Sequence, residues 1–213
     1  MIEISNIRVV GFEAAIRGMR NPMNSWDRSD SLFDGNDISE LGKNDLDLMR
    51  RLSSAGEDHG KFARMITVYM DILAPLYWWK EFDTYKVGTV ADSCSTMHKI
   101  AEKRFFLTDF STEYMDHAQR RVFMLVLEQL NHARDIFNAS DGKNKTMWYG
   151  GLIQMLPSSY NQKRTIATNY QTLKRMYDAR KNHKLSEWRA FCAKMHDLPY
   201  FDDIFFEGTK NDD

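Results

Sequence analysis

The chain contains 213 residues, with 29 Lys plus Arg against 30 Asp plus Glu, which gives a formal charge of -1. This balance argues against a nucleic-acid-binding protein, because such proteins carry a net basic surface. Hydrophobic residues make up 43% of the chain and there are only four prolines, which excludes a disordered or low-complexity protein. The length suits a single domain over residues 1–213, ending in an acidic tail at about 202–213.

No apolar run approaches the roughly 20 residues that a membrane span needs, and the first ten residues mix charges with aliphatic side chains. Cys94 and Cys192 are the only cysteines, which argues against a disulfide framework. The six histidines lack the spacing of metal ligands, so no metal site is expected. We therefore predict a cytoplasmic protein that acts on small molecules and not on membranes or nucleic acid.

The first half of the chain is expected to contain helices and one strand. Helices are predicted over residues 11–20 and 44–54, the second ending before Gly56. Residues 66–72 alternate between apolar and polar side chains, which predicts a half-buried strand. Pro75 then opens a short helix over 76–83, since proline is tolerated at the first helical position.

The second half is expected to be mostly helical, which makes the chain a helix-rich member of the α+β class. An apolar stripe predicts a core helix over 112–137, begun by Ser111 or Thr112 and followed by a loop up to Leu156 and Pro157. Further helices are predicted over 164–180 and 188–195. The stripe of the core helix consists of Met115, Ala118, Val122, Val126, Leu130, Ala133 and Phe137.

Positive charge gathers between residues 161 and 184, where seven Lys and Arg stand against one acid, Asp178. This segment can attract an anionic ligand. At about 1.5 Å per residue, Asn169 and Arg180 lie roughly 16 Å apart on one helical face, a span that a nucleotide could bridge. The alternative interpretation is that both side chains simply meet solvent on the surface of a helix.

Two separated blocks of the sequence share the residue spacing of a known family. The first block runs from His59 through Ala74-Pro75 to Cys94, and contains Lys80-Glu81 and Thr84-Tyr85-Lys86. The second contains Leu156-Pro157, Asn169, Arg180 and the run His183-Lys184-Leu185-Ser186-Glu187-Trp188. In both blocks, which together cover about half the chain, the spacing resembles that of the flavin-dependent thymidylate synthases.

The departures from the family pattern fall at its signature. The family's Arg-His-Arg is replaced by Thr84-Tyr85-Lys86, so that only Lys86 keeps a permanent charge. The serine that closes the first block is Cys94, with Ser95 beside it, and the glutamate two residues earlier is Asp92. A glutamate of the first block becomes Arg64, and an arginine of the second becomes Gln171.

The resemblance implies a central, mostly antiparallel sheet flanked by long helices, and a homotetramer whose active sites form between subunits. It implies reductive methylation of deoxyuridine monophosphate (dUMP) to dTMP, with the methylene group from methylenetetrahydrofolate and hydride from flavin adenine dinucleotide (FAD) reduced by NADPH. Arg180 would be the catalytic residue and would contact the nucleotide together with Lys80, Glu81, Asp92, Cys94 and Ser95. The residues implied for FAD are His59, Lys61, Arg64, Thr84, Tyr85, Lys86, Asn169 and Gln171.

Other interpretations stay open at this stage. Loss of the Arg-His-Arg signature favours a protein of the same fold that binds a nucleotide or flavin but has lost or changed the methyl transfer. Retention of Asn169, Arg180 and Lys80-Glu81 favours a working active site. A third interpretation is a helical interaction protein in which the matched spacing is accidental. A nucleophilic thiol at Cys94 also stays open, although a small buried thiol is the commoner role.

Overall fold

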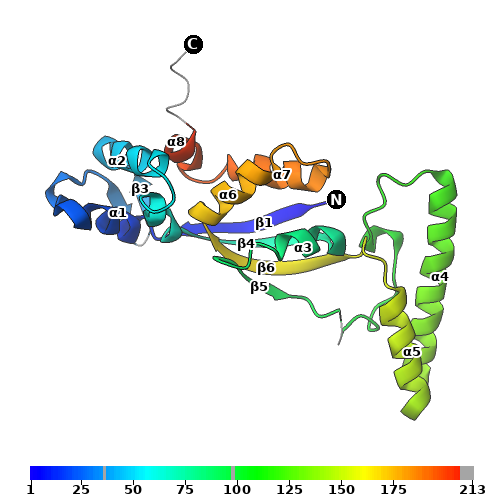
Figure 1. Ribbon diagram of the computed structural model, residues 1–213. Helices are drawn as coiled ribbons and strands as arrows, with labels where there is room; N and C mark the ends of the chain where they lie inside the picture. The colour runs from blue at the N-terminus through cyan, green and yellow to red at the C-terminus, as the bar shows by residue number, and fades with distance from the viewer. Residues whose placement is uncertain (36, 97–98, 207–213) are drawn as a thin grey trace. The chain divides into compact units, whose positions relative to one another are not determined.

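The computed structural model describes residues 1–35, 37–96 and 99–206, and the chain divides into two compact units (Figure 1). Unit 1 comprises residues 1–3, 72–83 and 92–164. Unit 2 comprises residues 4–71, 84–91 and the chain from Thr165 onward. That these units act as one domain stays a prediction.

The sheet elements are short, and most of the chain outside them is helical. The strands are β1 (Glu3–Val10), β2 (Leu32–Asp34), β3 (Asp37–Glu40), β4 (Thr67–Pro75), β5 (Val90–Ser93) and β6 (Asn161–Asn169). The α-helices are α1 (Phe12–Arg20), α2 (Lys43–Ser54), α3 (Leu76–Phe82), α4 (His117–Ala139), α5 (Gly142–Met155), α6 (Tyr170–Arg180), α7 (Ser186–Met195) and α8 (Phe201–Phe205). Single 3₁₀ turns are η1 (Asn21–Met23), η2 (Trp26–Arg28), η3 (Gly60–Arg64) and η4 (Leu107–Asp109).

The main sheet has the strand order β1-β4-β6-β5, and β2 and β3 form a separate antiparallel pair. The predicted fold class is confirmed, because the chain is helix-rich and carries an antiparallel sheet. In β4 the alternation works as the sequence predicts: Val68, Met70 and Ile72 are buried, while Tyr69 between them is 46% exposed. The predicted helices at 11–20, 44–54, 76–83 and 188–195 are confirmed as α1, α2, α3 and α7.

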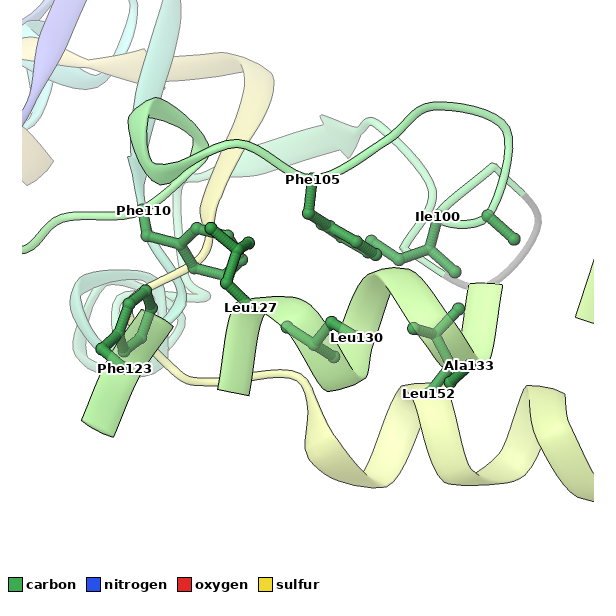
Figure 2. Packing of buried hydrophobic residues seen from close by; sticks show 9 residues of the cluster. Ile100, Phe105, Phe110, Phe123, Leu127, Leu130, Ala133 and Leu152 are labelled. Carbon is green, nitrogen blue, oxygen red and sulfur yellow. The ribbon is translucent and has the colours of Figure 1, made fainter. Parts of the chain in front are cut away.

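Unit 1 is built around α4 and α5, which lie side by side (Figure 1). The predicted core helix exists, but it begins at His117, where the carboxylate of Asp116 accepts a hydrogen bond from the Gln119 N–H, so the predicted caps Ser111 and Thr112 are wrong. Of the predicted stripe, Leu130 and Ala133 are buried as expected, whereas Val122 is 62% exposed. The nine side chains of the buried cluster come from α4, α5 and the 100–110 segment (Figure 2): Ile100, Ala101, Phe105, Phe110, Phe123, Leu127, Leu130, Ala133 and Leu152.

Helix α5 lies where the sequence predicts a loop. Gly142, Gly150 and Gly151 lower the intrinsic helix propensity of this stretch. Packing overrides that weak preference, because Leu152 is fully buried against the α4 cluster. The loop prediction is therefore wrong, because tertiary packing stabilises α5 and the local sequence does not reveal that packing.

The predicted helix over 164–180 is wrong in its first part, which is strand β6, and right from Tyr170 on. Ile166 and Thr168 are buried and Thr165 is exposed, which is the period of a strand. β-Branched residues pack well on a pleated surface. Asn169 ends the strand and caps the following helix, so it does not share a helical face with Arg180 as predicted.

In unit 2 the start of α6 is held by an aromatic cluster. Tyr170 is fully buried, and its ring centroid lies 5.8 Å from that of Phe12 and 5.2 Å from that of Phe201. Its hydroxyl donates a 2.6 Å hydrogen bond to the Pro199 carbonyl. Since α6 also packs on α7 and η3, this cluster fixes the helix that carries the second predicted block.

Of the predicted acidic tail, residues 202–205 belong to α8, and residues 207–213 lie outside the described part of the chain. Within residues 1–35, 37–96 and 99–206, no helix has both the length and the apolar character needed to cross a bilayer.

Candidate functional site

Three of the residues predicted to bind a cofactor lie around one cavity of unit 2. The cavity has a volume of about 740 Å³, and His59, Lys61 and Arg64 contribute to its wall. All three are exposed, whereas Phe62 between them is buried. A 3₁₀ helix has three residues per turn, so Lys61 and Arg64 lie on the same, solvent-facing side of η3. The apolar part of the wall is formed by Met19, Pro22, Met23, Leu48, Leu52, Phe62 and Met65.

This cavity combines an apolar wall with cationic groups, which is how sites for flat, partly charged ligands are built. Lys61 and Arg64 supply positive charge and His59 supplies a ring nitrogen, with Asp58 as the one acidic residue of the wall. Such a set can hold an apolar ring system and an attached anionic group together.

The second predicted group, Thr84 to Lys86, reaches α6 through Tyr85. Arg180 Nε donates a 3.0 Å hydrogen bond to the Tyr85 hydroxyl oxygen. The Arg180 guanidinium carbon also lies 5.8 Å from the centroid of the Tyr85 ring and 5.0 Å from that of Trp188. The structure thus brings together a predicted FAD residue and the predicted catalytic residue, although the two are 95 positions apart.

Asn169 serves as the N-cap of α6. Its side-chain oxygen accepts a 2.9 Å hydrogen bond from the Thr172 N–H, and its Nδ2 donates to the Gly88 carbonyl at 3.4 Å. Gly88 has φ +87, and a Cβ there would lie 2.5 Å from Thr172 Oγ1, so only glycine fits. The sequence does not predict this capping role. The hydrogen bond to Gly88 holds the 84–91 loop close to the start of α6.

Gln171 lies apart from the cavity that His59 lines. It belongs to the wall of a smaller cavity of about 290 Å³, together with Lys174 and Arg175. Its side chain reaches the vicinity of Gly60, where a Cβ would approach Gln171 Oε1 to 3.4 Å. Gln171 therefore lies close to Gly60 but does not line the cavity that contains His59.

The predicted nucleotide residues outside α6 belong to unit 1. Lys80 is exposed and Glu81 half-buried on α3, while Asp92 is exposed on β5. Cys94 is exposed and Ser95 half-buried, so the expectation of a buried thiol at Cys94 is wrong. The backbone of Cys94 is held on both sides: its N–H donates to the Lys163 carbonyl at 2.9 Å, and its carbonyl accepts from Gln162 Nε2 at 2.8 Å.

Gln162, which is buried, and Arg164, which is half-buried, form a polar network that the sequence analysis does not predict. Arg164 Nη1 donates to Asp83 Oδ1 at 2.8 Å and Arg164 Nε to Gln162 Oε1 at 3.0 Å. The Arg164 guanidinium also lies 4.3 Å from the centroid of the Trp79 ring. This network connects the end of α3 with the backbone of Cys94 through Gln162. The sequence does not predict it, because Arg164 is expected in a helix and instead lies on strand β6.

The thiol of Cys192 behaves differently from a reactive cysteine. Burial raises its pKa to about 11, although the nearby charge of Arg180 lowers it in part. A thiol with that pKa is protonated near neutral pH and is a weak nucleophile. Cys192 is therefore a packing residue beneath α6.

No protein-family model matches the sequence, and no curated protein does. Solved structures do match over nearly the whole chain. Thymidylate synthase X (ThyX) from Helicobacter pylori with FAD and dUMP is 16% identical, covers 100% of both chains and has a TM-score of 0.68. A second Helicobacter pylori ThyX complex with FAD and dUMP is 14% identical, with a TM-score of 0.68 over 96% of this chain and 98% of that one.

The UMP/dUMP methylase PolB from Streptomyces cacaoi, bound with 5-Br dUMP, is 12% identical and has a TM-score of 0.62 over 96% of this chain and 92% of that one. At such low identities the likeness concerns the fold. The resemblance inferred from two blocks of sequence is confirmed at that level: this chain has the fold of the flavin-dependent thymidylate synthases.

Proposed function

We propose that the protein is a flavin-dependent enzyme that modifies dUMP, and that its reaction is the reductive methylation of dUMP to dTMP. In this proposal methylenetetrahydrofolate provides the one-carbon unit, NADPH the reducing equivalents and FAD the hydride carrier. The protein acts in the cytoplasm as a homotetramer. The fold supports the coarser part of the proposal, since the structural neighbours contain FAD or a uridine nucleotide.

The observation that carries the proposal is the 740 Å³ cavity with His59, Lys61 and Arg64 in its wall. These residues fit FAD chemically, because the flavin ring needs an apolar surface and the pyrophosphate needs cations or N–H donors. The volume falls within the range of roughly 300 to 1,000 Å³ that is usual for ligand sites. Bound FAD would supply hydride to the substrate carbon.

The residues of this chain then bind and orient the ligands and shield the hydride from water. Lys61 and Arg64 neutralise the anionic part of the cofactor, and we assign His59 and the residues Thr84, Lys86, Asn169 and Gln171 to the same ligand. For the nucleotide we assign Arg180 as the catalytic residue, whose guanidinium can hold a pyrimidine carbonyl or phosphate in two-pronged fashion. The other residues assigned to the nucleotide are Lys80, Glu81, Asp92, Cys94 and Ser95.

A second candidate function is favoured by the contact between Tyr85 and Arg180. The divergent tripeptide engages the protein's own arginine at 3.0 Å, which suits a nucleotide- or flavin-binding protein with altered specificity or without methyl transfer. The fold also includes a protein described as a UMP/dUMP methylase. Both candidates share the nucleotide site and differ in the chemistry performed there.

Three measurements on one preparation separate these candidates. Protein expressed with ample riboflavin is examined for flavin absorbance and titrated with dUMP by calorimetry. It is then incubated with dUMP, methylenetetrahydrofolate and NADPH, and dTMP is quantified against a sample without folate. The proposal expects a yellow protein, dUMP binding and folate-dependent dTMP. Binding without dTMP would favour the second candidate, and a colourless protein that neither quenches FAD fluorescence nor binds dUMP would refute both.

A further inference from the structure

Tyr85 is held firmly in the 84–91 loop. Its carbonyl accepts a 2.6 Å hydrogen bond from Thr89 Oγ1, so the loop closes on itself one turn later. Gly88 of the same loop packs against Asn169 and Thr172 at the start of α6. The Tyr85 side chain is half-buried as a result, and its hydroxyl reaches the last turn of α6.

Tyr85, Trp188 and Arg180 contact one another in all three pairings. The Tyr85 and Trp188 ring centroids lie 6.1 Å apart, and the Arg180 guanidinium lies 5.8 and 5.0 Å from them. Trp188 is fully buried, so its ring is a fixed surface for the guanidinium. An aromatic face attracts a guanidinium, and the attraction grows when solvent is excluded.

A guanidinium is planar, with five N–H donors in a fixed arrangement. The 3.0 Å hydrogen bond from Arg180 Nε to the Tyr85 hydroxyl therefore sets the direction of both terminal nitrogens, once the Trp188 ring fixes the plane. One hydroxyl group on the loop thus contributes to the orientation of the Arg180 guanidinium.

We infer that Tyr85 is a positioning residue for Arg180, and that it acts on the nucleotide through Arg180 instead of contacting FAD. This inference rests on the proposed function, in which Arg180 binds the uridine nucleotide. It explains how a chain with tyrosine at the centre of Thr84-Tyr85-Lys86 keeps an arginine oriented: a neutral hydroxyl accepts from Nε without competing for positive charge. The role differs from the FAD contact that the family resemblance implies for the same position.

The test compares Tyr85→Phe with Tyr69→Phe, both of which delete one hydroxyl and keep the ring. Tyr69 is an exposed residue of β4 and serves as the matched control. Affinities for dUMP and for FAD are measured by calorimetry on the full-length protein. Tyr85→Phe should weaken dUMP binding about tenfold, since a hydrogen bond to a charged group is lost, and should leave FAD affinity and the unfolding midpoint as in the control.

A double-mutant cycle with Arg180→Lys gives a readout that a purely structural role would not change. Lysine has no Nε–H to donate, so Tyr85→Phe should weaken dUMP binding no further in that background. Additive losses would overturn the inference, as would an equal loss of FAD affinity or an unchanged dUMP affinity in Tyr85→Phe. Wild-type protein that binds no dUMP would overturn the proposed function itself, which distinguishes that failure from failure of the inference alone.

Discussion

The guanidinium carbon of Arg180 lies 5.0 Å from the centroid of the Trp188 ring, in the last turn of α6 and beside the start of α7. Glu187, the neighbour of Trp188, is 1% exposed, so this corner of unit 2 combines a buried carboxyl group with aromatic surface. Charged groups in such surroundings interact strongly with a ligand, because little water screens them. This contact makes Arg180 the most informative position to change.

Arg180→Ala should lose about 1.5 to 3 kcal/mol of dUMP binding, which is roughly a ten- to a hundredfold loss of affinity, because a charge-assisted hydrogen bond disappears. Arg180→Lys should recover only part of the loss, since lysine keeps the charge but not the planar fork. Calorimetry with dUMP and thermal unfolding on both variants are the measurements.

The control for Arg180 is Arg175→Ala on the same helix, whose exposed ion pair with Glu57 spans 3.5 Å and should contribute little. A structural role for Arg180 predicts the reverse pattern, with a lowered melting temperature and intact dUMP binding. Unchanged dUMP affinity in both Arg180 variants would remove α6 from the nucleotide site.

Lys61→Glu should weaken FAD binding about tenfold, because a negative charge replaces a positive one in the wall of the 740 Å³ cavity. The difference from wild type should shrink as salt is added, since exposed charges are screened. Fluorescence quenching of FAD at two ionic strengths measures both effects. Lys103→Glu makes the same charge change at an exposed position of unit 1 and should bind as wild type does. Equal quenching by Lys61→Glu and wild type would place the flavin elsewhere.

Much of the fold could be predicted because local signals agree with tertiary structure there. The alternation in β4 matches its buried positions, and Gly11 adopts φ +99 directly before α1, as a residue free to take left-handed backbone does. Helix α4 shows where such signals stop. A helix carries several candidate stripes, and tertiary packing decides that Phe123 and Leu127 are buried while Val122 is exposed. The Phe123 ring, for example, lies 5.2 Å from that of Phe110, between centroids.

The sequence indicates which positions belong to the candidate site, but not which of their side chains contact one another. Spacing placed Tyr85 and Arg180 in two blocks, and nothing in a linear pattern states that their side chains meet at 3.0 Å. The sequence predicts that Asn169 faces a ligand, whereas its side chain caps α6, because the residues before it form strand β6 and not the predicted helix. The role of Gln162 depends on the backbone of Cys94, a contact that residue type alone does not indicate.

Cys94→Ser should bind dUMP as wild type does and keep any dTMP formation. The groups that connect Cys94 to the protein are its backbone N–H and carbonyl, which serine retains. Thiol labelling should modify exposed Cys94 and spare buried Cys192, whose raised pKa of about 11 also disfavours the thiolate. Calorimetry and the dTMP assay measure the effect, and loss of activity with intact binding would show that the thiol itself is a nucleophile.

Arg20 and Asp45 form a buried ion pair that fixes the 25–34 segment of unit 2. Arg20 Nε donates to Asp45 Oδ1 at 2.7 Å, and both residues are almost fully buried. Asp45 Oδ2 accepts from the hydroxyls of Ser29 and Ser31 and from the backbone N–H groups of residues 30 and 31. Asp45→Asn should cost about 3 to 5 kcal/mol of unfolding free energy at neutral pH, because it leaves the Arg20 charge without its counter-ion.

The cost of Asp45→Asn should depend on pH. Burial raises the pKa of Asp45, but the hydrogen bonds from Ser31, Arg20, Ser29 and the Asp30 N–H outweigh it, so the pKa lies below its ordinary value. A lowered pKa in the folded protein means that the stabilisation is complete above the unfolded value of about 3.9 and is lost as the pH falls through the folded value. Urea unfolding between neutral pH and about pH 3 should therefore show the difference between wild type and Asp45→Asn shrinking only below about pH 4. Asp47→Asn, an exposed change on the same helix, should follow wild type throughout. A difference that stays constant down to the lowest pH would show that the Asp45 carboxylate does not carry this stabilisation.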